Sequence, residues 1–369
     1  MNQQEGLPLL EHLLARCVEL GASDLHLTHQ CPPYVRIDGV LQPLPEAPVL
    51  SSRQTEGIAL ALMNPRQQEV FAQRHTLDLA HSLGEVRFRI NVFRQQGEVA
   101  LAVRRLENVF RTFEELLLPK SLEELSRLRD GLVLITGPTG SGKTTTLATL
   151  IHQINQHRAC HIITVEDPLE YLHRNIKSLV HQRELYTDVP SFAEAVRSAL
   201  REDPDVILVG EMRDLETMRA AITAAETGHL VFSTLHTGDA VGALDRIIGV
   251  FPADEQQSVR QQLSMVLRAV VAQRLLPRRD RPGRVPVVEL LRVTTGVAHL
   301  IRTGKPQQIY AAIETGTSQG MQTLEAALAQ VIHQGLVEPP AALALARDPQ
   351  LVHSRLRLLA QKSGQAGGG

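Results

Sequence analysis

The chain has 369 residues, of which 43% are hydrophobic and 21% are charged, a balance typical of a globular protein with two domains. Its net charge is −2, only 3% of its residues are aromatic and it has no tryptophan. It therefore lacks the basic surface and the stacking residues that mark nucleic-acid-binding proteins. Cys17, Cys31 and Cys160 lie far apart, which favours reduced thiols in a cytoplasmic protein over disulfides or a zinc site.

Nothing in the sequence predicts insertion into a membrane. The first residues, MNQQEGLPLLEHLLA, lack the basic region of a signal peptide. No apolar run approaches the length of a bilayer-spanning helix. We therefore expect any association with a membrane to go through a protein partner.

The first hundred residues predict a small α+β domain. Residues 7–20 place apolar side chains at helical spacing, and Pro8 suits the first turn of that helix. Residues 23–28 alternate between polar and apolar side chains as a half-buried strand does. Residues 34–44 predict a hairpin, because an Asp-Gly pair separates two short apolar runs.

Residues 85–106 predict a second hairpin that turns near Gln96 and Gly97. Successive side chains of a strand point to opposite faces, so the first strand has an apolar face and a polar face. Arg87, Arg89 and Asn91 lie on the polar face, whereas Val86, Phe88, Ile90 and Val92 lie on the apolar face.

The run GLVLITGPTGSGKTTTLATLI, residues 131–151, predicts a strand, a glycine-rich loop and a helix with the spacing of a phosphate-binding P-loop. Glycines let the backbone N–H groups point at phosphate oxygens, and the start of the helix adds the positive end of its dipole. The Lys143 ammonium should reach the β- and γ-phosphates, and the Thr144 hydroxyl should bind Mg²⁺. The nucleotide-binding residues are therefore predicted to be Gly137, Pro138, Thr139, Gly140, Ser141, Gly142, Lys143, Thr144 and Thr145.

From Gly131 onwards strands alternate with helices, which indicates a parallel α/β sheet, and three further apolar runs end on polar residues. Glu211 ends the run VILVGE in the Walker B position, where it should hold Mg²⁺ directly or through water. Glu166 is the candidate for activating the attacking water, because P-loop enzymes that hydrolyse nucleoside triphosphates need a carboxylate beside the γ-phosphate. His236 is a candidate γ-phosphate sensor, with a structural histidine as the equal alternative. Ligands of open α/β sheets bind beyond the carboxyl ends of the strands, where these groups should meet.

These motifs resemble those of the secretion ATPase superfamily and, more narrowly, those of the PilT or twitching-motility family of type IV pilus retraction ATPases. The resemblance runs from about Ser23 to about Glu338. It is carried by SDLHL, RFRINVF, GPTGSGKTTT, VEDPLEY, the long stretch from Ser198 to Thr237, and GMQTLEAAL. A chance match over that long stretch is not credible.

The resemblance implies an α/β fold with two domains. A PAS-like α+β N-terminal domain would occupy residues 1–110, and residues 111–130 would form a linker. Residues 131–363 would form a RecA-like P-loop ATPase domain with a helical C-terminal part. The glycine-rich tail, residues 364–369, is expected to be disordered.

The resemblance also implies roles for individual residues. Glu166 matches the general base, Glu211 the Walker B acid, and the two histidines of the His box are His229 and His236. Family members send arginines from the N-terminal domain to the γ-phosphate. The candidates here are Arg89 and Arg104, with a solvated basic face as the alternative for each.

The implied protein is a homohexamer that uses ATP and Mg²⁺ and lies in the cytoplasm, at the inner membrane through a pilus platform protein. The assembly and type II secretion ATPases of the superfamily carry a four-cysteine zinc element, but no cysteine follows Cys160 here. That absence favours pilus retraction.

The signature AIRNLIRE of the retraction ATPases is replaced by GVAHLIRT at residues 296–303, with Ala298 and His299 in place of Arg and Asn. This departure leaves open an accessory ATPase working beside a second retraction ATPase, or a retraction-type paralogue with another duty. Three further alternatives stand apart from it: an assembly or type II secretion ATPase, a ring subunit that binds nucleotide without catalysis, and a RecA-like nucleic-acid motor.

Overall fold

The structure of the chain is a computed structural model, which describes residues 3–106 and 109–366. The chain divides into two compact units. The first comprises Met1–Val109, Val165–His173 and Gln182–Ser191, and the second comprises Phe110–Thr164, Arg174–His181 and Phe192–Gly369. The acidic turn after Glu166 therefore groups with the N-terminal residues, although the domain boundaries expected from the sequence place it in the ATPase domain.

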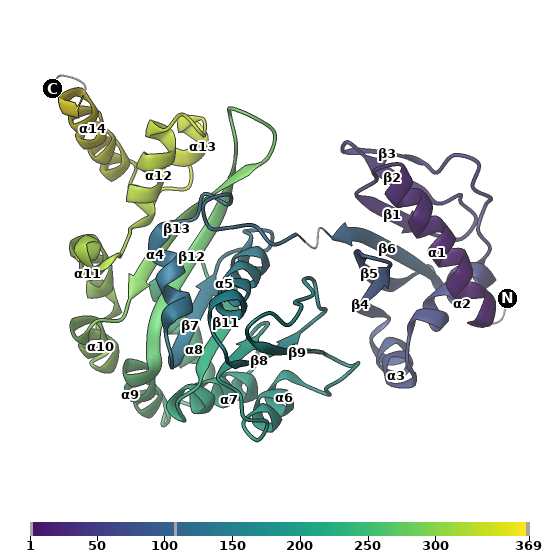
Figure 1. Ribbon diagram of the computed structural model, residues 1–369, viewed down its shortest axis with the longest axis horizontal. Coiled ribbons are helices and arrows are strands. Elements are labelled where there is room, and N and C mark those ends of the chain that lie inside the picture. The colour runs from purple at the N-terminus through teal and green to yellow at the C-terminus, as the bar shows by residue number, and fades with distance from the viewer. Residues whose placement is uncertain (1–2, 107–108, 367–369) are drawn as a thin grey trace. The chain divides into compact units, whose positions relative to one another are not determined.

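An antiparallel sheet and three helices form the N-terminal part of the first unit (Figure 1). The sheet has six strands in the order β3-β2-β1-β6-β5-β4. The elements are α1 (Gln3–Glu19), β1 (Asp24–Leu27), β2 (Tyr34–Ile37), β3 (Val40–Pro43), α2 (Ser52–Leu62), α3 (Pro65–Arg74), β4 (Thr76–Leu83), β5 (Val86–Gln95) and β6 (Glu98–Leu106).

Both expected hairpins are present and turn at the expected residues. In the β2–β3 turn, Asp38 and Gly39 have φ angles of +48° and +82°. In the β5–β6 turn, Gln96 and Gly97 have φ angles of +51° and +85°. Two consecutive residues with positive φ suit two-residue hairpins, because their twist matches that of the flanking strands.

Helix α1 begins at Gln3, earlier than expected, so that Pro8 lies inside it rather than in its first turn. The reason is a tertiary contact with α2. A Cβ atom at Gly6 would lie only 2.3 Å from the Gly57 carbonyl oxygen, so the two helices approach closely at this pair of residues. The burial of Gly6 explains why the helix extends beyond the segment that its own periodicity indicates.

The first unit has its core between the apolar face of β5 and the helices. Phe88, Ile90 and Val92 are buried there in one cluster with Leu10 and Leu14 of α1. Strand β5 thus has the predicted apolar and polar faces. Because successive side chains of a strand point to opposite faces, its arginines point away from this core.

The sheet of the second unit has seven strands in the order β13-β12-β7-β11-β10-β8-β9. Strands β10, β11, β7 and β12 are parallel neighbours, whereas β12 and β13 form an antiparallel edge. The strands are β7 (Gly131–Thr136), β8 (His161–Glu166), β9 (Leu179–Glu184), β10 (Val206–Val209), β11 (Leu230–Leu235), β12 (Leu267–Pro277) and β13 (Arg284–Arg292).

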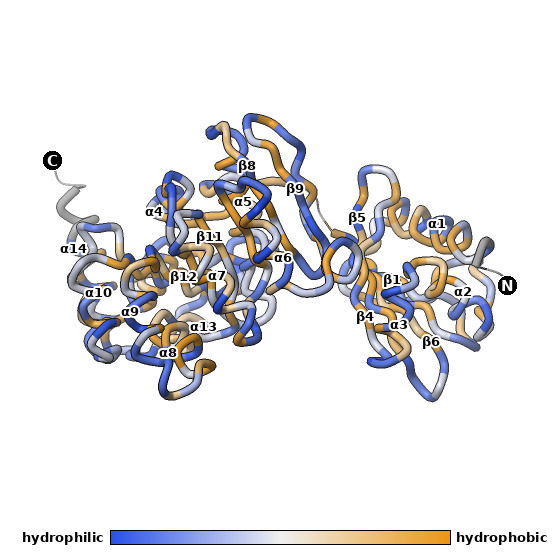
Figure 2. Tube along the Cα trace, turned by 90° about the horizontal axis from the view of Figure 1, so that it is seen from below, coloured by the Kyte–Doolittle hydropathy of each residue, from blue (hydrophilic) through white to orange (hydrophobic). Residues whose placement is uncertain are grey.

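Every residue of β7, β10 and β11 is buried, because helices cover both faces of the sheet. Figure 2 shows hydrophobic residues concentrated along β11 and β12. The helical elements before and between the strands are α4 (Lys120–Glu123), the 3₁₀ turn η1 (Glu124–Arg127), α5 (Lys143–His157), α6 (Phe192–Ala199), α7 (Leu215–Glu226), α8 (Ala240–Val250) and α9 (Gln256–Val266).

The C-terminal part is helical, as expected. It contains α10 (Thr295–Arg302), η2 (Pro306–Gln308), α11 (Ile309–Thr315), η3 (Gly316–Gln319), α12 (Leu324–His333), α13 (Pro339–Leu343) and α14 (Pro349–Ala366). The first three residues of the expected disordered tail thus belong to α14, and residues 367–369 lie outside the described residues. Among the described residues, no helix combines the length and the apolar character needed to cross a bilayer.

Candidate nucleotide site

The glycine-rich loop follows β7 and leads into α5, as the motif predicts (Figure 1). Gly137 has a φ angle of +149°, and a Cβ atom there would lie 2.2 Å from the Gln273 carbonyl oxygen. Gly142 has a φ angle of +87° at the start of α5. Both positions need glycine, one because the backbone of β12 is close and the other because of its left-handed conformation.

The Lys143 ammonium lies against the loop itself. Its Nζ atom donates hydrogen bonds to the carbonyl oxygens of Gly137 at 2.8 Å and Pro138 at 3.0 Å. Burial lowers the pKa of Lys143, and the negative charge of Glu211 opposes that shift. The P-loop lysine and the Walker B glutamate are therefore close enough to interact electrostatically.

The Ser141 hydroxyl supports the assignment of a phosphate-binding loop. Its oxygen is buried and has no hydrogen-bond partner within the described structure. A buried hydroxyl without a partner is energetically costly. A phosphate oxygen at this loop would accept its hydrogen bond, so the residues present fit a nucleotide phosphate.

Gln273 of β12 holds the loop from the neighbouring strand, a contact that the sequence did not reveal. Its side chain is buried, donates to the Ser141 carbonyl oxygen at 2.8 Å and accepts from the Thr146 hydroxyl at 2.8 Å. The loop and the first turn of α5 are thus fixed to one amide group. No local motif marks Gln273, because it is more than 120 residues away along the chain.

Glu211 and His236 meet at the same edge of the sheet. They follow β10 and β11, which are parallel neighbours, and β11 also pairs with β7. The Glu211 carboxylate lies 3.5 Å from Nε2 of His236 and 2.7 Å from Nε of Arg213. The Glu211 side chain is 15% exposed, whereas those of His236 and Arg213 are 46% and 73% exposed.

A threonine pair ties this edge to the P-loop. The hydroxyl groups of Thr136 and Thr237 lie 2.7 Å apart, and the Thr237 N–H donates to the Thr136 hydroxyl at 2.9 Å. Thr136 is the last residue of β7, and Thr237 directly follows His236. The loop that carries His236 is therefore fixed to the strand that carries the P-loop.

His229 lies at the other end of β11 and does not join this group. Its Nδ1 atom is 2.9 Å from the Ala224 carbonyl oxygen and 3.1 Å from the Thr227 hydroxyl. These contacts hold it at the end of α7, where it connects that helix to the following strand.

In the first unit, Glu166 and Arg89 each contact neighbours in the acidic segment. The Glu166 carboxylate is nearly buried, and the Gln182 amide lies 3.4 Å from it. The Arg89 guanidinium is 3.1 Å from Glu170 and 3.5 Å from Asp78. Burial lowers the pKa of Arg89, but these carboxylates outweigh it and raise the pKa above its ordinary value.

Arg87, the neighbour of Arg89 on the polar face of β5, also binds the acidic turn. Its Nε donates to the Leu169 carbonyl oxygen at 3.1 Å, and Nη2 lies 3.2 Å from the Glu184 carboxylate. The Leu169 N–H in turn donates to Glu184 at 3.1 Å. Arg87 and Glu184 thus fix the backbone that follows Glu166, a role that the sequence did not indicate.

Arg104, the second arginine candidate, is placed differently. It lies on β6, its side chain is 71% exposed and its Nε is 2.9 Å from Asp24. Arg104 is paired with Arg89 across the two strands, so both arginines stand in register in the sheet.

Comparison with known proteins agrees with this architecture. Residues 2–343 match the family model described as "Type II/IV secretion system protein". The chain is 44% identical to the type IV pilus retraction ATPase PilT of Pseudomonas aeruginosa, over 92% of this chain and 99% of that protein. It is 43% identical to the type IV pilus ATPase PilU of the same organism, over 90% of this chain and 87% of that protein.

A solved structure gives the same result. The crystal structure of the pilus retraction motor PilT with bound ADP superimposes with a TM-score of 0.83 at 44% identity, covering 92% of this chain and 97% of that chain. The fold and the loop geometry thus define a P-loop ATPase. More narrowly, the chain belongs to the type II/IV secretion ATPase family and, within it, to the PilT group of type IV pilus retraction ATPases. The fold class and the family expected from the sequence are confirmed.

Proposed function

We propose that this ATPase is a Mg²⁺-dependent homohexameric motor that powers type IV pilus retraction. It would act at the cytoplasmic face of the inner membrane, through a pilus platform protein. The names and the near full-length identity of its relatives support this function. In the proposed organisation, residues 1–110 form the N-terminal domain, residues 111–130 the linker and residues 131–363 the ATPase domain.

One observation supports the proposed chemistry above the others. Lys143, Glu211 and His236 gather where the parallel strands β7, β10 and β11 end. Nucleotide hydrolysis requires three groups at one edge of the sheet: a cation for the phosphates, an acid for a metal ion and a group that can sense the terminal phosphate.

We assign the triphosphate to the loop from Gly137 to Thr145. Mg²⁺ would be held by the Thr144 hydroxyl and the Glu211 carboxylate, which are the oxygen ligands that this cation prefers. Mg²⁺ would neutralise charge on the phosphates. Glu211 would bind the metal directly or through water, and direct binding would compete with its contacts to Arg213 and His236.

Glu166 is the proposed general base, which orients and deprotonates the attacking water. Arg89 and Arg104 are the proposed arginines for the γ-phosphate. Arg89 first has to leave Glu170, to which it is bonded at 3.1 Å. We therefore propose that the exchange of Arg89 between Glu170 and the γ-phosphate accompanies each cycle of hydrolysis.

The Glu166→Gln variant tests the catalytic assignment. It keeps the shape of the side chain but cannot accept a proton, so turnover should fall by about 10²–10⁴-fold. ATP binding, followed with a fluorescent nucleotide, should be retained. An ATPase rate equal to that of the wild type would remove Glu166 from this role.

Deletion of the gene separates retraction from assembly or secretion. Loss of a retraction motor should leave cells hyperpiliated and unable to twitch, whereas loss of an assembly ATPase should leave them without pili. The accessory alternative, an ATPase that works beside a second retraction ATPase, rests on the changed retraction signature at residues 296–303. If the protein is such an accessory ATPase, its overproduction should restore twitching to the deletion strain only when the second ATPase is overproduced as well.

Two measurements address the remaining alternatives. An ATPase assay of the purified protein distinguishes a motor from a ring subunit without catalysis. Added DNA should leave the rate unchanged, because a RecA-like nucleic-acid motor is not expected at a net charge of −2.

Native mass spectrometry with ATP and Mg²⁺ should detect six subunits.

A further inference from the structure

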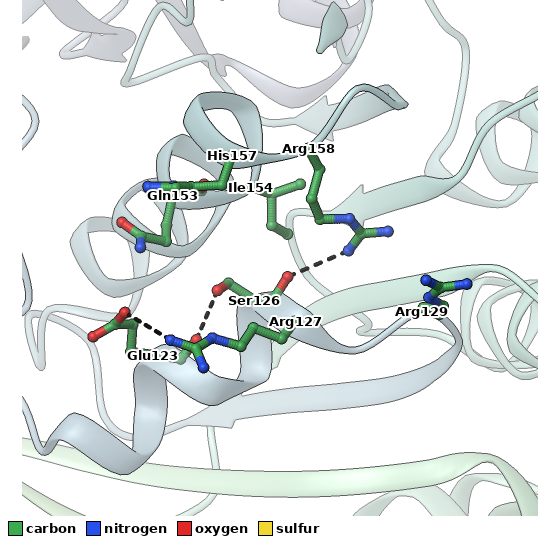
Figure 3. Close-up of a pocket in the computed structure, with 8 residues that line it drawn as sticks. All are labelled: Glu123, Ser126, Arg127, Arg129, Gln153, Ile154, His157 and Arg158. Atoms are coloured by element: carbon green, nitrogen blue, oxygen red, sulfur yellow. Dashed lines mark hydrogen bonds and ion pairs between the residues drawn. The ribbon is translucent and has the colours of Figure 1, made fainter. Parts of the chain in front are cut away.

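A pocket of 340 Å³ lies between the end of α5 and the turn η1 (Figure 3). Ser126 and Arg127 of η1 line one side, and Ile154 and His157 of α5 line the other. Arg158 and Arg129 complete it where the chain leaves α5 and approaches β7. The pocket is therefore built entirely within the second unit.

This pocket is separate from the P-loop. The P-loop follows the last residue of β7 and precedes α5, whereas Arg129 precedes β7 and Arg158 follows α5. Fifteen residues of helix separate the two ends of α5, a length of about 22 Å. A group bound in the pocket thus lies at the opposite edge of the sheet from the nucleotide site.

The charged groups of the pocket do not balance. The pocket is lined by three guanidinium groups, those of Arg127, Arg129 and Arg158, and by one carboxylate, that of Glu123, which gives a formal charge of +2 with His157 neutral. Arg129 is exposed, and its side chain makes no hydrogen bond or ion pair with any described residue. The pocket therefore favours an anion, and a phosphate monoester carries about −1.5 to −2 charges at pH 7.

Arg158 is held in position by the backbone. Its Nη1 atom donates to the Leu128 carbonyl oxygen at 2.7 Å and to the Ser126 carbonyl oxygen at 3.3 Å. No carboxylate pairs with it among the described residues. A fixed guanidinium loses little entropy on binding, so its other nitrogen atoms are ready to bond a phosphate.

Arg127 is held only weakly. Its Nη2 atom lies 3.4 Å from Glu123, and the two side chains are 75% and 28% exposed. Exposed ion pairs of this kind contribute little to stability. An anionic phosphate ligand competes with Glu123 for this guanidinium, so Arg127 can turn from the carboxylate to the ligand.

We propose that this pocket binds a phosphate group through Arg129, Arg158 and Arg127, at a site distinct from the ATP site. The phosphate belongs either to a soluble phosphorylated ligand or to the headgroup of an anionic phospholipid. Both present tetrahedral phosphorus with at least two free anionic oxygens, and planar guanidinium groups bind such oxygens in pairs.

Two substitutions with opposite effects test the site. Arg129→Gln removes a guanidinium that has no structural contact, so affinity should fall by about tenfold or more with no loss of folding. Glu123→Gln removes the competing carboxylate and frees Arg127, so affinity should rise. Arg197→Gln is the matched control. It also removes one positive charge from an exposed side chain, which pairs with Glu216 and does not line the pocket.

Binding is measured in a Lys143→Gln background, so that the P-loop contributes less. Equilibrium dialysis with radiolabelled inorganic phosphate tests the soluble source. Flotation with phosphatidylcholine vesicles, with and without phosphatidylglycerol, tests the lipid source. Thermal unfolding of each variant checks that it is folded.

The site is supported if one of the probes binds, if Arg129→Gln weakens that binding, if Glu123→Gln strengthens it and if Arg197→Gln leaves it unchanged. The probe that binds then identifies the source of the phosphate. If neither probe binds, or if Arg129→Gln and Arg197→Gln have equal effects, the proposal is overturned. Its failure would leave the proposed motor function intact, because no residue of the pocket belongs to the ATP site.

Discussion

The Arg347 guanidinium forms an ion pair with the Glu289 carboxylate, which is 1% exposed. The other oxygen of Glu289 accepts the Ala240 N–H at 3.0 Å, at the first residue of α8. Arg347 also lies 3.7 Å from Glu325 and 3.9 Å from Asp239. This guanidinium thus connects the C-terminal helices to the helix that follows the His236 loop.

We expect Arg347→Ala to be strongly destabilising, because it leaves the buried Glu289 without its counter-ion. Loss of one partner of a buried pair costs about 3–5 kcal/mol, and we expect the lower end since the Arg347 side chain is 34% exposed. Urea unfolding measures the change. Arg279→Ala is the control: its pair with Glu338 is more than half exposed, so its cost should be about 0–1 kcal/mol.

The pH dependence of stability should contain a contribution from Glu289. Burial raises the pKa of Glu289 above its ordinary value of 4.5, although Arg347 and the Ala240 N–H oppose the shift. The folded state therefore holds this proton to a higher pH than the unfolded state does. The contribution of Glu289 is fully favourable below pH 4.5 and is lost as the pH rises through its raised pKa.

The Glu289→Gln variant isolates that contribution. Its free energy of unfolding should fall less steeply with rising pH than that of the wild type, in urea titrations between about pH 4 and pH 8. Parallel curves for the two proteins would contradict a raised pKa at Glu289.

Two glycines of the P-loop should tolerate alanine differently. Gly137→Ala would place its Cβ 2.2 Å from a backbone oxygen of β12, so the loop must move and nucleotide binding should be lost. A Cβ at Gly140 meets no atom within 4 Å, so that variant should lose only about 1–2 kcal/mol for its left-handed backbone. Urea unfolding and binding of a fluorescent ADP compare them, and equal losses would refute the steric argument.

Gln273→Leu should weaken nucleotide binding although Gln273 is not in the P-loop motif. The change leaves the Ser141 carbonyl and the Thr146 hydroxyl without their partner, and each unsatisfied buried group costs about 1–3 kcal/mol. We expect the affinity for ADP to fall by about tenfold or more. Gln322→Leu is the control, since Gln322 bonds the Val288 carbonyl oxygen of β13 instead, and it should leave ADP affinity unchanged.

The two candidate arginines can be separated by kinetics. An arginine that stabilises the γ-phosphate contributes about 10³–10⁵ to phosphoryl transfer, so Arg89→Ala and Arg104→Ala should lower kcat that far with KM little changed. Arg105→Ala, one residue along β6 and on the opposite face, serves as control. If kcat is unchanged in either variant, that arginine does not act on the γ-phosphate and belongs to a solvated basic face of the strand.

The sequence was sufficient to predict features that depend on neighbouring residues. The two hairpins and the P-loop with its flanking strand and helix are all present. Each depends on a turn residue or a hydrophobic period within a short segment, so a local pattern specifies it.

The tertiary structure alone decided which distant residues meet. Gln273 beside Thr146, Glu184 beside Arg87 and Arg347 beside Glu289 are pairs separated by 58 or more residues. No periodicity or motif links such residues, because the topology of the sheets brings them together only after the chain has folded. The sequence thus determined the chemistry of the nucleotide loop, and long-range packing determined which side chains hold that loop, the turn after Glu166 and the C-terminal helices in place.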